Sequence, residues 1–463
     1  MEDREPLIKN LRAIFEPTSI AIIGASNDPG KIGNVILRNF VEGGYSGQIF
    51  VVNPNVKEIM GKKSYPSILK IPYSVDCAII VTPAKTVPKI LLQCAKKKIK
   101  GAVVISSGFS EIGNTKDERK IAQIAYKHNI SLIGPNCMGV LNPLRKNDSV
   151  FLPLYKMGRP RAGNISFISQ SGAVGGCIVD LSARAEIGIS KFISYGNATV
   201  INECDLLEYL SQDEKTEIII MYIEGVRDGQ RLMKVSRAIT KQKPIIVLKA
   251  GKGKLGSEAA KSHTGAMAGS YETYKAAFSQ CNMIEARTLD ELFWFAKIFS
   301  QPKPNGKRVG IITNGGGNGV LAADAIEEYG LTLAKFSSQT KKFLRSSLPQ
   351  YANIKNPLDL IGDADTARYE LAIDALLDDP EVDSIVIIVL FQTVGIDSDI
   401  VRMLIKKSQM RRKPLVVVST GGEYTEMHTR ILDSYGIPTY PSPSSAIASL
   451  SKFTNYALSL KSD

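Results

Sequence analysis

The stretch ISFISQSGAVG at residues 165–175 decides the fold class. It begins with a short run of β-branched and aromatic residues, continues through a turn of small polar residues, and ends in a segment of helical character. The stretch VGIITNGGGNG at residues 309–319 repeats this order. A strand, a tight turn and a helix are the building unit of parallel α/β sheets, so both stretches predict such a sheet. Shared architecture explains the repeat, and a shared phosphate-binding role is the alternative.

Three series of strand-length runs extend outward from these two stretches. Each series alternates with amphipathic segments, which predicts parallel, doubly wound sheets. The first series is 19–23, 48–52, 77–81, 102–105 and 131–133; the second is 164–169, 191–194, 217–223 and 244–248; the third is 308–313, 384–390, 414–419 and 437–440. We therefore predict an α/β protein of three consecutive doubly wound domains, with boundaries at 1–145, 146–300 and 301–463.

The composition limits the classes of function. The chain has 463 residues, of which 44% are hydrophobic and 22% charged, and its six cysteines show no paired spacing. This composition indicates a globular protein with reduced thiols and predicts neither a disulfide framework nor a metal site. The apolar runs are too short to span a membrane and the polar start lacks a secretory signal, so we expect a cytoplasmic protein. A net charge of +13 without a nucleic-acid-binding motif favours a small polyanion over nucleic acid.

The turn after the first predicted strand reads GASNDPGKIG at residues 24–33. A dinucleotide fingerprint needs a second glycine two residues after the first and an acidic residue about 20 positions later. This sequence has Ser26 and then Asn53-Pro54 at those places, which disfavours NAD. Ile32 stands where a nucleoside-triphosphate loop requires Ser or Thr. The turn is still suited to a pyrophosphate at a helix amino terminus. Its candidate contacts are Gly24, Ser26, Lys31 and Gly33.

Further turns follow the other strands of this predicted sheet at its carboxyl edge, where ligands of such sheets bind. They are rich in small polar residues, which can line a groove or simply form turns. The candidates at this edge are Asn53, Pro54, Thr82, Pro83, Ser106, Ser107, Gly108, Asn136 and Cys137.

The two repeated turns are candidate phosphate sites. Unpaired backbone N–H groups at a helix start combine with the helix dipole to attract an anion. The small residues of both turns leave little side-chain bulk to block an approaching oxyanion. The candidates are Ser169, Gln170, Ser171 and Gly172 in the second series, and Asn314, Gly315, Gly316 and Gly317 in the third.

His263 stands in a glycine- and lysine-rich stretch, GKGKLGSEAAKSHTGA at residues 251–266. The other two histidines, His128 and His428, lie in polar helical patterns where surface placement is expected. Glu224 follows the predicted strand 217–223, and a carboxylate there either orients an imidazole for nucleophilic attack or only caps a helix. A loop histidine is often only solvated, so both interpretations stay open.

Several motifs together resemble a known family. They are SHTGA at 262–266, SQSG at 169–172, IEG at 223–225, and GPNC at 134–137. These resemble the α subunit of succinyl-CoA synthetase, over roughly the first 300 residues. The third series, with TNGGG at 313–317, resembles the ligase domain that succinyl-CoA synthetase carries on its β subunit. The whole arrangement is similar to the α subunit of ADP-forming acetyl-CoA synthetases.

The resemblance implies a Rossmann-like CoA-binding domain followed by two flavodoxin-like ligase domains. It implies a phosphohistidine at His263 supported by Glu224, and two phosphate-facing helices that begin near Ser171 and Gly315. Acyl-CoA, ADP and phosphate would be interconverted with free acid, ATP and CoA through an acyl phosphate. The family binds ADP or ATP with Mg²⁺ mainly on an ATP-grasp β subunit, so a separate β subunit in an α2β2 heterotetramer is implied.

Two other functions compete with this expectation. A non-catalytic CoA-sensing subunit would keep the first domain but would not need His263 and Glu224 together. A dehydrogenase would need the glycine and the ribose-binding acid that the first turn lacks. The sequence therefore favours an acid–thiol ligase.

Overall fold

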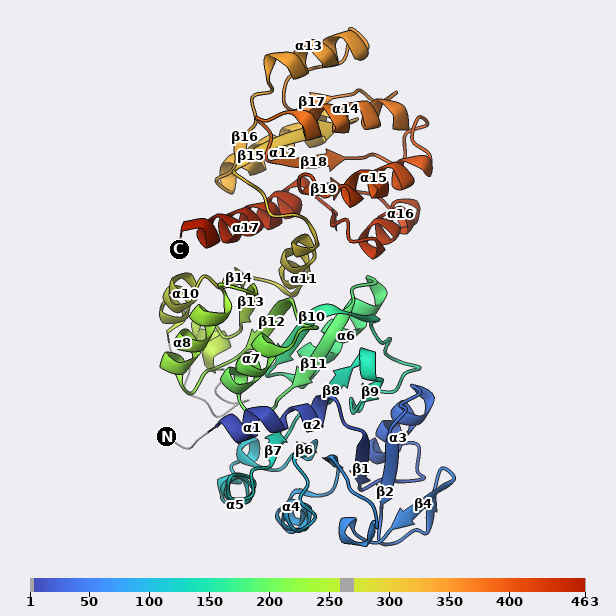
Figure 1. The fold of residues 1–463 in the computed structure, drawn as a ribbon, viewed down its shortest axis with the longest axis vertical. Coiled ribbons are helices and arrows are strands. Elements are labelled where there is room, and N and C mark those ends of the chain that lie inside the picture. The colour runs from blue at the N-terminus through green and yellow to red at the C-terminus, as the bar shows by residue number, and fades with distance from the viewer. Residues whose placement is uncertain (1–3, 259–269, 463) are drawn as a thin grey trace. The chain divides into compact units, whose positions relative to one another are not determined.

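The computed structural model describes residues 4–258 and 270–462 (Figure 1). The chain forms two compact units, Met1–Glu285 and Ala286–Asp463. The first unit holds two sheets and the second holds one. Parallel strand pairs dominate each sheet, which confirms the predicted α/β class with three consecutive sheets.

The first sheet has seven strands in the order β3-β4-β2-β1-β5-β6-β7. All neighbours are parallel except β3 and β4. Strand β1 is buried along its whole length, as expected for a parallel strand with both faces covered. The strands are β1 Ser19–Ile23, β2 Gln48–Val52, β3 Glu58–Ile59, β4 Lys62–Tyr65, β5 Cys77–Ile80, β6 Gly101–Val104 and β7 Ser131–Ile133; the connecting helices are α3 Ile32–Glu42, α4 Val87–Lys96 and α5 Thr115–Lys127.

The second sheet has the order β14-β13-β12-β10-β11-β8-β9. Its central strands are parallel, and β8 adds to β11 in antiparallel orientation. Strand β8 precedes the predicted boundary at residue 145, yet it completes this sheet and not the first. The strands are β8 Gly139–Asn142, β9 Asn147–Asp148, β10 Ala162–Ser169, β11 Ile189–Ser194, β12 Ile218–Ile223, β13 Ile245–Lys249 and β14 Ile284–Ala286; the helices are α6 Gly172–Arg184, α7 Glu203–Gln212, α8 Gly229–Ile239 and α10 Tyr271–Gln280.

Two short helices at the start of the chain join these two sheets. Helix α1 (Glu5–Asn10) contacts β7 and α7, and α2 (Arg12–Phe15) contacts β6 and β8 (Figure 1). Leu7, Leu11, Ile14 and Phe15 are buried there and belong to the same hydrophobic core as both sheets. The first unit is therefore one packed body, in which the carboxyl edges of two sheets can contribute to one site.

The second unit carries the third sheet, in the order β16-β15-β18-β19-β20, with β17 also paired to β15. All of its named strand pairs are parallel. The strands are β15 Arg308–Thr313, β16 Thr332–Leu333, β17 Leu358–Asp359, β18 Ser384–Ile388, β19 Leu415–Val418 and β20 Thr439–Tyr440; the helices are α11 Leu289–Lys297, α12 Gly316–Glu328, α13 Ser338–Ser347, α14 Thr366–Asp378, α15 Asp399–Gln409, α16 Glu423–Ser434 and α17 Pro443–Ser462.

Every strand-length run predicted from the sequence overlaps a strand of the structure. The additional strands are at most four residues long, too short for a hydrophobic pattern to reveal them. His128 is exposed, as expected, but the surface placement expected for His428 is wrong. The residue is 3% exposed, and its ring stacks on Phe391 with 4.8 Å between ring centroids. The ring nitrogen Nδ1 lies 2.7 Å from the carbonyl oxygen of Tyr424. No helix of the described residues is long and apolar enough to cross a membrane.

Candidate functional site

The topological switch point of the second sheet brings two predicted residues together. The chain leaves β10 for β11 on one side and returns to β12 on the other, and ligands of open α/β sheets bind where this reversal occurs. Gln170, directly after β10, accepts hydrogen bonds at Oε1 from the backbone N–H groups of Glu224 (2.7 Å) and Gly225 (3.1 Å). This one side chain therefore fixes the end of β12 relative to the start of α6.

The turn between β10 and α6 is braced by hydroxyl groups. Ser169 Oγ donates to the carbonyl oxygen of Ser171 at 2.6 Å, and Ser171 Oγ accepts from the N–H of Val174 as the N-cap of α6. Helix α6 then begins at Gly172 and runs for 13 residues. Its first N–H groups and its dipole are held at the carboxyl edge of the sheet, the arrangement that binds anions.

The third sheet repeats these contacts at its own switch point between β15 and β18. Asn314 Oδ1 accepts from the backbone N–H of Leu390 at 2.9 Å, as Gln170 does across the second sheet. Thr313 Oγ1 donates to the carbonyl oxygen of Gly315 at 3.0 Å, as Ser169 does to Ser171. The likeness of the two turns thus extends from composition to individual hydrogen bonds, which favours a shared role over shared architecture alone.

The glycines at the start of α12 leave its first N–H groups accessible. Gly315 is the N-cap, and a side chain there would meet Leu390 Cδ1 at 2.6 Å. A side chain at Gly316 would approach Asp359 Oδ2 to 2.9 Å, whereas Gly317 faces open space. Among the described residues, no side chain therefore covers the solvent-facing side of the helix start, as an oxyanion site requires.

Glu224 lies at the end of β12 and is 8% exposed. Tyr222 donates its hydroxyl to Glu224 Oε1 at 3.5 Å, and Lys249 donates Nζ to the Glu224 carbonyl oxygen at 2.8 Å. His263 lies outside the described residues, so its predicted contact with Glu224 stays a prediction. The carboxylate nevertheless occupies the strand-end position that such a contact needs.

The first predicted turn forms the switch point between β1 and β5 of the first sheet. Gly24 has a φ of +97°, and Gly33 in α3 packs so closely on it that an added Cβ would lie 2.1 Å from the Gly24 carbonyl oxygen. Ser26 Oγ accepts from the N–H of Asp28 at 3.1 Å. Lys31 is the exposed N-cap residue of α3. The turn and the helix start are thus tightly joined and face the sheet edge.

The other predicted residues of this edge are held by local hydrogen bonds. Asn53 Nδ2 donates to the Ala25 carbonyl oxygen at 2.8 Å, which ties the ends of β1 and β2 together. Ser106 Oγ donates to the carbonyl oxygen of Thr82 at 2.5 Å, and the Gly108 N–H donates to Glu111. Pro54 and Pro83 are exposed. These contacts form one continuous edge from β2 to β6.

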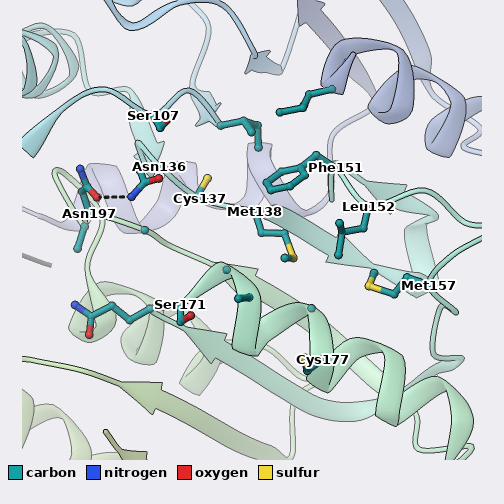
Figure 2. Close-up of a pocket in the computed structure, with 18 of the residues that line it drawn as sticks. Ser107, Asn136, Cys137, Met138, Phe151, Leu152, Met157, Ser171, Cys177 and Asn197 are labelled. Carbon is teal, nitrogen blue, oxygen red and sulfur yellow. Dashed lines mark hydrogen bonds between the residues drawn. The ribbon is translucent and has the colours of Figure 1, made fainter. Parts of the chain in front are cut away.

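A cavity of about 740 Å³ within the first unit is lined by residues from the carboxyl edges of both its sheets (Figure 2). Ser107, Asn136 and Cys137 reach it from the first sheet, and the second sheet contributes Gln170, Ser171 and Gly172. The remaining predicted residues of the first unit that the structure describes do not line it. Figure 2 shows Met138, Phe151, Leu152 and Met157 along the wall that faces α6, with Ser171 at the helix start and Cys177 further along it. A polar end at the helix start thus meets an apolar wall.

Several residues that line the cavity were not predicted. They are mainly the apolar wall and a polar rim made by the segment after β11, the start of α7 and the segment after β12: Met138, Phe151, Leu152, Pro153, Met157, Asn197, Asn202, Glu203 and Arg227. Asn136 Nδ2 donates to Asn197 Oδ1 at 3.2 Å, which links the edges of the two sheets (Figure 2). Asn197 follows a predicted strand of a doubly wound sheet, and that position was the one available signal.

Two titratable groups of the cavity have strongly shifted pKa values. Burial raises the pKa of the Cys137 thiol to about 12, so this thiol stays protonated and unreactive at neutral pH. Burial also raises the pKa of Glu203 from 4.5 to about 7. A carboxyl group of this pKa exchanges protons near neutral pH, unlike an ordinary surface glutamate.

Family models match three consecutive parts of the chain. A CoA binding domain matches residues 18–143, a succinyl-CoA ligase like flavodoxin domain matches 162–299, and a ligase-CoA domain matches 309–459. The solved acetyl-coenzyme A synthetase 1 from Ca. Korarchaeum cryptofilum, in complex with phosphate and ADP, is 34% identical with a TM-score of 0.91, and the match covers 97% of each chain. The order of folds in this chain is therefore that of a known ligase.

Curated relatives agree with the family models. The alpha subunit of acetate–CoA ligase [ADP-forming] II from Pyrococcus furiosus is 42% identical over 94% of this chain and 95% of its own length. Acetate–CoA ligase [ADP-forming] I from Archaeoglobus fulgidus is 41% identical over 96% of this chain, which spans 64% of that longer relative. The chain thus covers nearly all of the first relative and a little under two thirds of the second. It belongs to the family of ADP-forming acetate–CoA ligases.

Proposed function

We propose that this chain is the α subunit of an ADP-forming acyl-CoA synthetase that acts on acetyl-CoA or a related thioester. Acyl-CoA, ADP and phosphate are interconverted with free acid, ATP and CoA through an acyl phosphate and a phosphohistidine at His263. One observation carries the proposal: the cavity of the first unit places the start of α6 opposite residues of the first sheet's edge. A thioester and a phosphate can meet there.

The first step is attack of phosphate on the acyl carbon. Phosphate is held by the N–H groups at the start of α6, next to Gln170, Ser171 and Gly172, where preorganised dipoles stabilise the charge that develops on its oxygens. CoA lies along the edge that begins at the first turn. We assign its contacts to Gly24, Ser26, Lys31, Gly33, Asn53, Pro54, Thr82, Pro83, Ser106, Ser107, Gly108, Asn136 and Cys137.

The second step moves the phosphoryl group to His263. Glu224, fixed through Gln170, accepts a hydrogen bond from one ring nitrogen and leaves the other nitrogen free to attack phosphorus. The bond from phosphorus to the acyl oxygen breaks, and the free acid leaves. Gly315, Gly316, Gly317 and Asn314 form a second phosphate site of the same construction, which we assign to a later position of the same phosphoryl group.

The nucleotide is assigned to a partner. Relatives named as alpha subunits support a separate subunit, and we propose an ATP-grasp β subunit in an α2β2 heterotetramer that binds ADP or ATP with Mg²⁺. Among the described residues, no group of three or more His, Cys, Asp and Glu side chains could hold a metal ion. The three matched models support the domain boundaries 1–145, 146–300 and 301–463.

Phosphorylation of the protein tests this proposal. The chain is incubated with acetyl-CoA and radiolabelled phosphate, with and without its co-purified partner, and the labelled protein is treated with acid or alkali. We expect label that survives alkali, is lost in acid, and is absent from His263→Ala. A protein that binds CoA yet takes no label from acetyl-CoA or from a panel of other acyl-CoAs would instead be a CoA-sensing subunit.

A further inference from the structure

Glu203 is a buried carboxyl group that the proposed steps leave unused. It is the first residue of α7, whose start is fixed by a capping box between Asn202 and Asp205. The residue is 4% exposed and lines the cavity described above. No other described side chain hydrogen-bonds its carboxylate, and its own backbone N–H is the hydrogen-bond donor near it. A buried carboxylate in a cavity wall that receives no hydrogen bond from another described side chain points to a ligand group as its partner.

The surroundings of Glu203 are largely acidic or neutral. Tyr195 is fully buried, and its hydroxyl lacks a hydrogen-bond partner among the described residues. Its pKa is raised mainly by burial and further by the negative charges of Glu203 and Glu224. The negative charge of Asp205 raises the pKa of Glu203, and the positive charges of Arg227 and Arg231 lower it. Arg231 is already paired with Asp205 and Glu208, and Arg227 donates a hydrogen bond to the carbonyl oxygen of Asn197 at 3.1 Å.

The other titratable side chains of the cavity suit proton transfer less well. They are Cys137, Lys156, Cys177, Asp180 and Arg227. Lys156, Cys177, Asp180 and Arg227 are exposed to solvent, and Cys137 keeps its proton because burial raises its pKa. Glu203 is thus the buried carboxyl group of the wall, beside the predicted CoA and phosphate residues.

We propose that Glu203 is the catalytic base that takes the proton of the CoA thiol when CoA attacks the acyl phosphate, and returns that proton to the thiolate in the reverse direction. The inference rests on the proposed function. It adds a role for a residue to which the proposed steps assign neither phosphate nor the phosphohistidine.

The proton and electron balance is simple. In the direction of acyl-CoA formation, the S–H bond of CoA breaks and its proton moves to the Glu203 carboxylate. The sulfur attacks the acyl carbon, a C–S bond forms, and the bond from that carbon to the phosphate oxygen breaks with its electron pair leaving on phosphate. In the reverse direction phosphate attacks the thioester and protonated Glu203 gives its proton to the departing thiolate.

The acidity of Glu203 suits this exchange. Burial raises its pKa to about 7, so both forms are present at neutral pH. A base with a pKa near the working pH accepts a proton readily and gives it back readily. An ordinary glutamate would be too weak a base for a thiol, and a group of much higher pKa would be protonated before the thiol arrived.

Two half-reactions of the complete complex with its partner separate this role from phosphoryl transfer. One is acetyl phosphate plus CoA giving acetyl-CoA and phosphate, measured from pH 5.5 to 8.5, and the other is labelling of His263 by ATP. In Glu203→Gln we expect acetyl-CoA formation to fall by about 10² or more. The wild-type inflection near pH 7 should vanish, and labelling by ATP should keep its wild-type rate.

A control on the same helix is Glu208→Gln, because Glu208 pairs with Arg231 and does not line the cavity. We expect it to behave like wild type in both half-reactions. If Glu203→Gln does not fold, Glu203→Asp serves instead and should be slower while retaining an inflection. Equal slowing of both half-reactions, or an inflection that persists in the glutamine variant, overturns the role of Glu203. A wild-type protein that carries out neither half-reaction overturns the proposed function itself, and with it this inference.

Discussion

Gln170 and Glu224 are joined across the switch point of the second sheet by a hydrogen bond of 2.7 Å, from the Glu224 backbone N–H to Gln170 Oε1. The contact fixes the strand-end carboxylate relative to the start of α6 without using the carboxylate itself. Asn314 makes the corresponding contact with Leu390 in the second unit. In each of these two sheets, an amide side chain directly after the central strand thus fixes the geometry of the candidate phosphate-binding turn.

Removal of the Gln170 acceptor should weaken both the fold and phosphoryl transfer. Gln170→Met keeps the size of the side chain but leaves the N–H groups of Glu224 and Gly225 without an acceptor. We expect the free energy of unfolding to fall by about 1–3 kcal/mol. Labelling of His263 should slow, because Glu224 loses its fixed position. Urea unfolding and the rate of labelling measure the two effects.

The matched control for that substitution is Gln230→Met, at an exposed position of α8. It should change neither stability nor labelling. If Gln170→Met is as stable as wild type, the hydrogen bonds across the switch point contribute nothing to the fold, and the role given to Gln170 is wrong.

The sequence predicted the central strands and the two repeated turns because their signals are local. A β-branched run followed by small polar residues specifies a strand, a turn and a helix start whatever surrounds it. The hydrogen bonds of Ser169 and Thr313 to carbonyl groups two residues later are of this kind. The expectation for His428 was wrong because a polar helix pattern does not reveal that one turn packs on Phe391.

The cavity wall was not predictable for a different reason. Phe151 and Met157 lie in the passage between β9 and β10 of the second sheet, where no periodicity marks a buried face. Glu203 opens a helix, where a glutamate usually lies in solvent and complements the helix dipole. Its burial depends on how α7 packs beside the segment after β11, which is a tertiary property. Such residues emerge only when the sheet edges are seen together.

Glu203→Gln should stabilise the protein, and increasingly so as the pH rises. Burial raises the folded-state pKa of Glu203 from 4.5 to about 7. Between these values the unfolded chain releases a proton that the folded protein retains, so a rising pH favours unfolding until the carboxyl also ionises in the folded state. The cost is small at pH 5 and complete above pH 7.

The expected size follows from that shift. The variant's advantage over wild type in the free energy of unfolding should grow by about 2–3 kcal/mol from pH 5 to pH 8. Urea unfolding of both proteins at several pH values measures it, with Glu208→Gln as the control that shows no such trend. An advantage that is the same at pH 5 and pH 8 would mean that Glu203 ionises normally in the folded protein.

Gly33→Ala should disrupt the first turn. A Cβ at this position would lie 2.1 Å from the Gly24 carbonyl oxygen, and backbone has no room to move aside. Overpacking of this kind costs about 1–3 kcal/mol, and the displaced start of α3 should weaken CoA binding. Urea unfolding and calorimetric titration with CoA measure the two effects. Gly229→Ala is the control, because an added Cβ at the start of α8 meets open space; equal behaviour of the two variants would refute the close packing of α3 on the turn.

Asp205 should be among the most sensitive positions of the first unit. Its side chain is fully buried and receives hydrogen bonds from Arg4, from Arg231 and from the backbone N–H of Asn202. It thereby connects the segment before α1 to α7, the helix that carries Glu203 at its start.

Asp205→Asn removes the carboxylate partner of Arg4 and leaves Arg231 with Glu208 alone. We expect a loss of about 3–5 kcal/mol, because the Asp205 side chain is fully buried and breaking a buried ion pair is far costlier than breaking an exposed one. Glu208→Gln removes a partly exposed partner of the same Arg231 and should cost about 0–1 kcal/mol. Since Asp205 also closes the capping box, its loss should loosen the start of α7 and slow acetyl-CoA formation more than labelling of His263 by ATP. Urea unfolding and the two half-reactions measure these effects. An Asp205→Asn protein that is destabilised yet forms acetyl-CoA at the wild-type rate would mean that the chemistry assigned to Glu203 does not depend on the position of α7.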